Sequence, residues 1–208
     1  MRYLILLPLL ILAAACSLPS AEAPDTTTYR LSVPTLAPAT GASRLPITLV
    51  VALGYVAPEI QGQGIVIQHG DQRLDDVAGA RWPAPLPAYL RQQLIRGFVA
   101  GGGLRLVADV PVAGAVNYRL RLDILDFQIV EDAAEAPPRV HVRIQAVLQR
   151  LDEVAPRSET VIRAEARVPA EARRMSAIVR AFDQAFAEVA QRLAAGVYAA
   201  LAEAPGPG

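Results

Sequence analysis

Several residue types that carry chemistry are scarce in this sequence, which has one cysteine, two histidines and no lysine among 208 residues. A single cysteine cannot form an internal disulfide. The two histidines, His69 and His141, and one cysteine fall short of the four suitably spaced ligands of a structural zinc site. There is also no Gly-x-Ser-x-Gly segment, which disfavours the commonest serine-hydrolase arrangement. We therefore predict no catalytic residue, no metal site, no cofactor and no enzymatic activity.

Long apolar runs are also lacking. Arg2 precedes a run of about ten apolar residues, Tyr3–Leu12, whereas a membrane-spanning helix needs roughly 20. A charged start, a short apolar run and then Ala13-Ala14-Ala15 form the pattern of a removable secretory signal. Without residues 1–15 the chain keeps 19 basic and 20 acidic side chains, because Arg2 is the only charged residue removed. That balance favours neither nucleic acid nor an acidic membrane surface as a partner.

The only cysteine stands directly after the signal. The segment Leu12–Cys16 resembles a bacterial lipobox, in which the thiol is alkylated by diacylglycerol and the chain is cut just before the cysteine. The resemblance implies a lipid anchor at Cys16, and two or three acyl chains hold a protein on a bilayer. The residue after the cysteine is Ser17 rather than an aspartate, and in bacterial lipoproteins this implies sorting to the outer membrane. The alternative is an ordinary Ala-x-Ala cut after Ala15, which leaves a soluble periplasmic protein.

The composition divides the chain into four parts. Residues 1–15 are predicted to be the lipoprotein signal peptide and residues 16–28, small, polar and broken by proline, a lipidated tether. Residues 29–203 are long enough for one domain with its own core. Residues 204–208, rich in proline and glycine, are predicted to be a disordered tail.

Period-two alternation and β-branched runs predict strands at Tyr29–Val33, Ile47–Val56 and Gly64–His69. Between Gly70 and Pro87 the sequence is polar and interrupted by prolines, so we expect a loop there. Leucines at four-residue steps predict a helix over Leu86–Val99, ended by three glycines at 101–103.

A meander of three strands follows, and one of them changes phase. Apolar residues fall at even positions up to Ile124 and at odd positions from Leu125 on, which predicts a β-bulge there. Further strands are expected at residues 140–149 and at Thr160–Val168. The spacing then predicts a long amphipathic helix, Met175–Glu203. The fold class is therefore α+β: a single domain whose antiparallel or mixed sheet is packed by two main helices.

The arginine and aromatic side chains of the 70–89 region are candidates for partner binding, since these residue types dominate binding hot spots. We predict Arg73, Arg81, Trp82 and Tyr89 as partner contacts. The alternative for Trp82 is that it fills space at the sheet edge. The carboxylates of Asp71, Asp75 and Asp76 next to Arg73 are interpreted as solvated loop residues or partner contacts rather than a general acid–base pair.

The order of these elements resembles the ABC-type transport auxiliary lipoprotein family. The matching segments are Tyr29-Arg30-Leu31, Ile65-Val66-Ile67 with the later Arg81-Trp82 and its prolines, Tyr89–Leu94, and Ile178–Phe186. The resemblance implies a non-enzymatic component of an envelope lipid-transport system that docks the assembly at the outer membrane. Its implied partner is a mammalian cell entry (MCE) domain protein served by an inner-membrane ABC transporter.

Two other functions stay open at this point. One is direct binding of lipid or another hydrophobic ligand in a cavity between sheet and helices, and the other is regulation of cell-wall enzymes. Whether the chain forms a homo-oligomer is also open.

Overall fold

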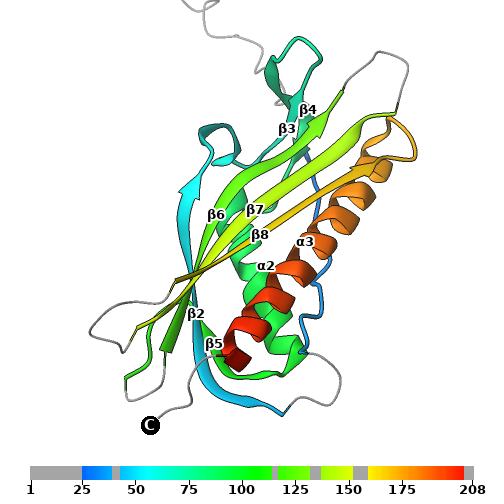
Figure 1. Cartoon of the computed structure of the whole chain (residues 1–208). Helices are drawn as coiled ribbons and strands as arrows, with labels where there is room; N and C mark the ends of the chain where they lie inside the picture. Colours follow the sequence, from blue (N-terminus) through cyan, green and yellow to red (C-terminus); the bar gives the residue numbers. More distant parts are fainter. Residues whose placement is uncertain (1–24, 39–42, 114–116, 132–136, 152–158, 204–208) are drawn as a thin grey trace, which may run out of the picture.

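A computed structural model describes residues 25–38, 43–113, 117–131, 137–151 and 159–203 of the chain. These residues form one mixed sheet of eight strands with two α-helices (Figure 1), which confirms the predicted fold class. The elements are β1 (Thr27–Thr28), β2 (Leu45–Val56), a 3-10 turn (Pro58–Ile60), β3 (Gly64–Gln68), β4 (Leu74–Arg81), α2 (Leu86–Gly101), β5 (Leu104–Ala108), β6 (Asn117–Val130), β7 (Arg139–Arg150), β8 (Glu159–Pro169) and α3 (Met175–Glu203).

The long strand β6 is the centre of the sheet. Along one edge it pairs antiparallel with β7, which pairs antiparallel with β8. Along its other edge β6 pairs in parallel first with β2 and then, near its end, with β3. The parallel strand β5 continues the sheet beyond β2, whereas the antiparallel strand β4 continues it beyond β3. The meander is therefore as predicted.

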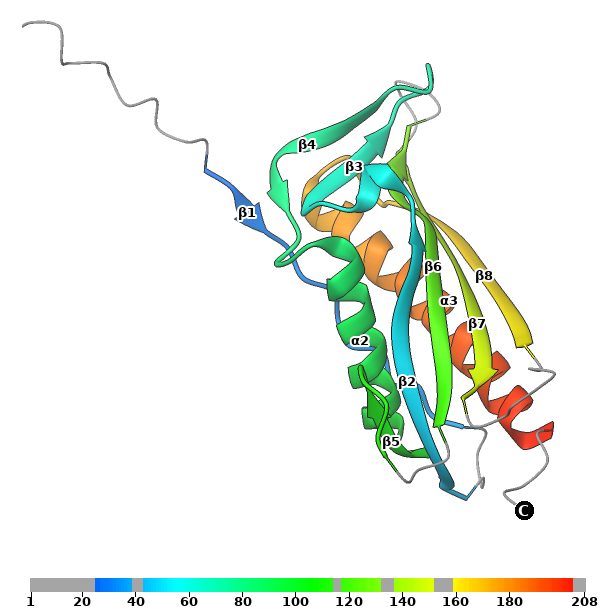
Figure 2. The ribbon, with the colours of Figure 1, turned by 90° about the vertical axis from the view of Figure 1, so that its left-hand side faces the viewer.

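Both helices cover the same face of the sheet, as the side view in Figure 2 shows. Helix α3 packs on β7 and β8, and α2 packs on β2 and β5. The apolar stripe of α3 is completely buried at Phe182, Val189 and Val197. Because the two helices and one sheet face enclose the apolar side chains, the core lies entirely on that side. The predicted bounds of α3 are confirmed, and α2 ends at the glycines as expected, with Gly102 in the left-handed conformation.

The predicted bulge is confirmed, since the register between β6 and β7 shifts between Ile124 and Asp126. Before the shift Ile124 points into the core, and after it Phe127 does; both are at most 1% exposed. The one extra residue therefore keeps β6 apolar on its helix-covered face along its whole length. It also sets Asp126 on the opposite face, directly beside Arg143 of β7.

The prediction of a first strand at Tyr29–Val33 is wrong. The short strand β1 precedes it, and residues 29–38, which we call the strap, have no regular secondary structure. Leu31 and Leu36 are buried because the strap lies along α2, where the backbone N–H of Leu36 donates to the carbonyl of Gly97. The apolar alternation thus reflects packing on a helix rather than strand pairing.

The polar connection expected between Gly70 and Pro87 also needs correction, because residues 74–81 form β4. This strand is mostly exposed and forms a hairpin with β3. The chain enters the described domain beside it, since β1 pairs in parallel with Ala80 and Arg81.

The predicted signal peptide, Cys16, most of the predicted tether and the predicted tail at 204–208 lie outside the described residues. Of the helices in the described ranges, neither is long and apolar enough to cross a membrane.

Candidate docking surface

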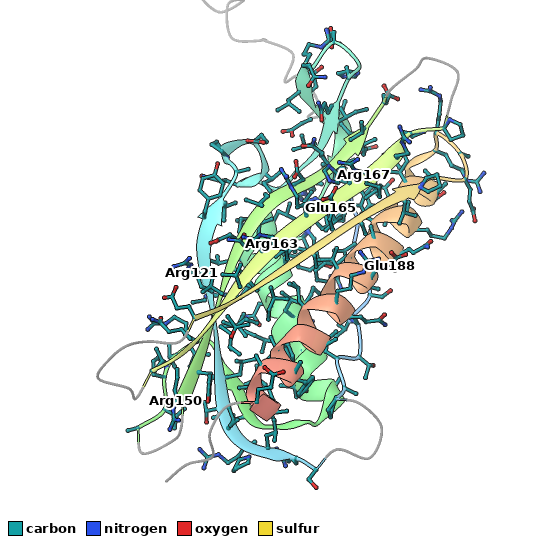
Figure 3. All side chains as sticks on the ribbon, viewed as in Figure 1. Arg121, Arg150, Arg163, Glu165, Arg167 and Glu188 are labelled. Carbon is teal, nitrogen blue, oxygen red and sulfur yellow. The ribbon has the colours of Figure 1, made fainter. Side chains whose placement is uncertain are left out.

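The face of β6, β7 and β8 that points away from both helices carries a regular array of polar side chains, which we call the open face. The strand register places the residues of this face in rows, all polar except for two valines: Arg121–Val147–Val161, Asp123–Gln145–Arg163, Asp126–Arg143–Glu165 and Gln128–His141–Arg167. Within the described part of the chain, no helix covers this face (Figure 2). Figure 3 shows Arg121, Arg163, Glu165 and Arg167 projecting from it.

The charges of the open face lie at different heights above the sheet. The carboxylates of Asp123 and Asp126 are low, with side chains 11% and 16% exposed. The paired guanidinium groups of Arg121 and Arg143 are each 49% exposed, and the side chain of Arg167 is 66% exposed. Asp123 and Asp126 thus lie beneath the bases, whereas Glu165 is 43% exposed, so the outermost surface of this face carries more arginine than carboxylate.

Asp123 is the best-held carboxylate of the open face. One oxygen accepts the backbone N–H of Tyr55 at 2.9 Å and is 3.6 Å from Arg121 Nε, and the other is 3.4 Å from Gln145 Nε2. Gln145 Oε1 in turn accepts a hydrogen bond of 3.1 Å from Arg163. This chain of contacts fixes Arg121 and Arg163 over the same patch, which limits the entropy lost when a partner binds them.

A second cluster lies further along the strands, around His141. Its Nε2 is 3.0 Å from Glu165, its Nδ1 is 3.9 Å from Asp126, and Glu165 also pairs with Arg167 at 3.0 Å. Asp126 itself forms a short contact with Arg143. The open face thus carries two clusters of linked polar side chains, one around Asp123 and one around His141.

Trp82, which we predicted as a partner contact, lies in the core and is 1% exposed. Its ring centroid is 5.3 Å from that of Phe182 on α3 and 5.7 Å from that of Phe127 on β6, both in edge-to-face contact. The residue therefore offers no exposed surface to a partner. It fills the space where β4, β6, α2 and α3 meet, which agrees with the packing alternative.

The other predicted contacts lie near the hairpin or the strap. The Tyr89 hydroxyl accepts the backbone N–H of Leu31 at 2.7 Å, so it holds the strap against α2. Arg81 is exposed on β4, and its Nε donates to Thr28 at 3.3 Å. Arg73 lies in the β3–β4 hairpin, where it pairs with Asp75 at 3.2 Å. Of the four predicted residues, Trp82 and Tyr89 stack with ring centroids 6.4 Å apart, but the four do not form one exposed surface.

The hairpin carboxylates form no enclosed acid–base site. Asp71 accepts the backbone N–H of Arg73, Asp75 contacts His69, and all three aspartates are exposed. The residues that the structure describes include no group of three or more histidine, cysteine, aspartate or glutamate side chains able to hold a metal ion.

Sequence reasoning missed the open face as a site. The signal was present in the alternating polar positions of β6, β7 and β8, but any half-buried strand shows that alternation. Only the register across three strands shows that the arginines gather on one uncovered surface.

The fold belongs to a class of small α+β domains in which a mixed sheet carries two helices on one face. The crystal structure of protein XCC0632 from Xanthomonas campestris, a DUF330 protein, superposes with a TM-score of 0.68 at 21% identity, covering 85% of this chain and 98% of that one. A second crystal structure, of an uncharacterized protein, gives 0.61 at 17% identity, over 83% and 99%. No curated protein matches the sequence.

The family model of the ABC-type transport auxiliary lipoprotein component matches residues 29–194. The chain belongs to this family, and it is therefore an auxiliary lipoprotein associated with an ABC-type transport system.

Proposed function

We propose that the protein is a non-enzymatic docking component of an MCE-type ABC lipid-transport system, held on the periplasmic face of the outer membrane by a lipid on Cys16. The family membership supports the transport role. The observation that carries the docking role is the open face, an uncovered surface topped by arginine side chains. Arginine is enriched in protein interfaces, and a positive surface selects a partner that presents carboxylates.

The entry point of the chain supports an orientation for this domain. Strand β1 is parallel to β4, so the chain reaches the domain from the side of the β3–β4 hairpin. A lipid on Cys16, nine residues before Asp25, keeps this end near the bilayer, because that stretch spans at most about 30 Å when extended. The hairpin then faces the membrane, and the opposite end of the sheet points into the periplasm, where an MCE-domain partner reaches it.

Association with the MCE-domain protein encoded by an adjacent gene tests the docking role. The lipidated full chain is purified in a non-ionic detergent and its co-elution with that protein is measured at two salt concentrations. We expect R121E/R163E to weaken the association at least 10-fold, and high salt to weaken the wild-type complex as well. R96E, an exposed arginine on α2, is the matched control and should bind as the wild type does. An R121E/R163E variant that binds normally would refute docking through the open face.

The anchor and the hairpin arginines are tested separately. C16S should release the protein from the membrane fraction and abolish palmitate labelling, whereas membrane association that persists without the thiol would refute the anchor. Arg73 and Arg81 stay proposed partner contacts, and R73E and R81E measure their separate contributions in the same co-elution assay.

An apolar cavity favours a second candidate function, direct binding of a hydrophobic ligand. It has a volume of about 530 Å³ and lies between the strap, the start of β2 and the last turns of α3, with Leu36, Leu45 and Tyr198 in its wall. Ligand sites commonly measure about 300–1,000 Å³. Native mass spectrometry of the purified full chain should detect a bound lipid if this function is real. A protein that is free of lipid and takes up none from added vesicles would exclude it.

A further inference from the structure

Strand β8 is a long edge strand. Among the strands of the described residues it pairs with β7 alone, along all 11 of its residues and without a shift in register. Figure 2 shows it as the outermost strand on that side of the sheet. The edge strand at the other side, β5, has 5 residues, and Arg44 donates to the carbonyls of Leu104 and Arg105 there. Neither the family membership nor the docking proposal assigns a role to the edge of β8.

The backbone groups of β8 alternate between the two sides of the strand. The N–H of Ala170 donates to the carbonyl of Pro138 at 2.9 Å, one step beyond the β7–β8 register. In an antiparallel pair every second residue repeats this orientation, so the even-numbered residues of β8 direct their backbone groups toward β7. The odd-numbered residues direct theirs outward, among them Val161, Arg163, Glu165 and Arg167. We call these four the outward row.

The outward row offers hydrogen bonds to a further strand. Because no described strand lies beyond β8, its four N–H groups have no strand partner. The carbonyl of Glu165 accepts a hydrogen bond from Arg192 of helix α3, which agrees with the outward direction. Native proteins commonly block such edges with prolines, bulges or a covering element. Strand β8 has no bulge and no proline before its last residue, Pro169.

We propose that the edge of β8 accepts an extended segment of the docking partner as an added strand. This inference rests on the proposed docking function and specifies how the partner is held. In strand addition the backbone hydrogen bonds supply the affinity, and side chains at alternate positions supply the specificity. The added strand continues the open face, so it and the arginine side chains of that face form one surface.

The side chains of the outward row select a segment that carries a carboxylate opposite Arg163. Arg163 Nε donates to the neutral amide of Gln145, and no carboxylate among the described residues forms an ion pair with Arg163. Glu165 and Arg167 pair at 3.0 Å, so together they add no net charge. Opposite residues on adjacent strands have Cβ atoms about 4.5–5.5 Å apart. A glutamate or aspartate of the segment therefore reaches the Arg163 guanidinium.

The alternate side chains of the segment lie on the side of helix α3, which packs on β8. The helix approaches the strand closely, because a Cβ added to Gly196 would lie 2.7 Å from Ile162 Cγ2. Ile162 and Ala200 are only partly buried although they pack against the core. This side thus offers small, apolar contacts, and a valine of the segment would bury apolar area there. The segment we infer alternates charged residues with apolar ones.

A peptide of defined sequence tests the edge. It alternates valine with charged residues in the order glutamate, lysine, glutamate. This order places unlike charges opposite Arg163, Glu165 and Arg167 in either strand direction. Binding of the fluorescently labelled peptide to the full chain in a non-ionic detergent is measured by anisotropy. We expect the peptide to bind, and a peptide with the order lysine, glutamate, lysine to bind at least 10-fold more weakly.

Methylation of the peptide backbone separates strand addition from contact through side chains alone. In an extended peptide, alternate amides point to opposite sides, so only one alternate set faces β8. We expect N-methyl groups on that set to abolish binding and N-methyl groups on the other set to leave it unchanged. An equal effect of the two sets would overturn the proposal.

Substitutions at Val161 test the same hydrogen bonds from the side of the protein. V161P removes an outward N–H, and an edge strand tolerates proline where the N–H faces solvent. We expect V161P to weaken peptide binding about 10-fold, whereas V161T keeps the N–H and should bind as the wild type does. R163Q should bind several-fold more weakly, and R96Q, on the exposed part of α2, should be unchanged. Circular dichroism verifies folding, and the methylated peptides decide the test if V161P is unfolded.

The remaining outcomes are equally decisive. No binding of the peptide, or equal binding of the two charge orders, would overturn the proposal. A dimer of the isolated chain that V161P dissociates, measured by sedimentation, would also overturn it, because the edge then belongs to a second copy. With the MCE-domain protein, V161P should co-elute more weakly than V161T, and equal co-elution would show that the partner does not use the edge. The peptide assay needs no partner, so its failure is distinct from a failure of docking in R121E/R163E.

Discussion

The hydroxyl of Tyr198, near the end of α3, donates a hydrogen bond of 3.1 Å to the backbone carbonyl of Leu36 in the strap. Both residues are buried. The contact joins the first part of the domain to its last helix across 162 positions of sequence, so the strap is part of the cooperative fold rather than a loose lead-in segment.

Replacing Tyr198 by phenylalanine removes this hydrogen bond while keeping the ring that contacts Phe98. We expect Y198F to lower the free energy of unfolding by about 1–3 kcal/mol, since the buried carbonyl loses its donor. Urea denaturation monitored by circular dichroism measures the change. Tyr55 is 57% exposed, so Y55F is the control and should be neutral. An unchanged midpoint for Y198F would show that the bond adds no net stability.

The same hydroxyl makes stability depend on pH in the alkaline range. Burial raises the pKa of the Tyr198 hydroxyl above its ordinary value, so the folded state keeps the phenol neutral at a pH where the unfolded chain ionises. This stabilisation is complete below about pH 10, the unfolded pKa, and is lost as the pH rises through the folded pKa. We expect unfolding free energies measured from pH 9 to 11 to fall less steeply in Y198F than in the wild type. Parallel slopes would contradict this assignment.

Gly97 allows the strap to approach α2. A Cβ at this position would lie 2.6 Å from the backbone oxygen of Pro34 and 2.8 Å from the Leu36 side chain. We therefore expect G97A to destabilise the protein by about 1–3 kcal/mol, as overpacking does, despite the better helix propensity of alanine. At Gly62 an added Cβ meets an atom only at 3.8 Å, so G62A is the control. Thermal unfolding compares the two, and equal stability would show that the strap moves aside without cost.

Trp82 should matter for stability and not for recognition. Because its ring is enclosed by Tyr89, Phe127 and Phe182, we expect W82A to cost about 3–5 kcal/mol and W82F to cost less. At a temperature where W82F is fully folded, its association with the proposed MCE-domain partner should equal that of the wild type. A folded W82F that fails to bind would restore Trp82 as a recognition residue.

The parts of the fold that were predictable depend on local pattern. Helix α3 has a sustained apolar stripe, and the bulge at Ile124 appears as a change of phase, so both follow from neighbouring residues alone. Strand β4 was missed because its own sequence is polar and contains Gly79, and only pairing with β3 makes it a strand. The parallel pairing of β2 with β5 and β6 was not predicted, because it depends on contacts between distant segments.

The candidate site was less predictable than the fold. Trp82 and Tyr89 were predicted as contacts from their residue type alone. In the structure Trp82 is a core residue, and Tyr89 holds the strap through a hydrogen bond. Arg121 and Arg163 look like ordinary outward-facing strand residues in sequence. Their common surface exists only because the chain reverses twice and aligns β6, β7 and β8 in register.

The strap also bears on how the domain withstands mechanical load. Its hydrogen bonds to Arg81, Tyr89, Asp183 and Gly97 run across its length rather than along it. Tension applied through the N-terminus would therefore shear these bonds together instead of opening them one after another like a zipper. Because several ordinary hydrogen bonds would share such a load, the strap would resist rupture without any single strong bond.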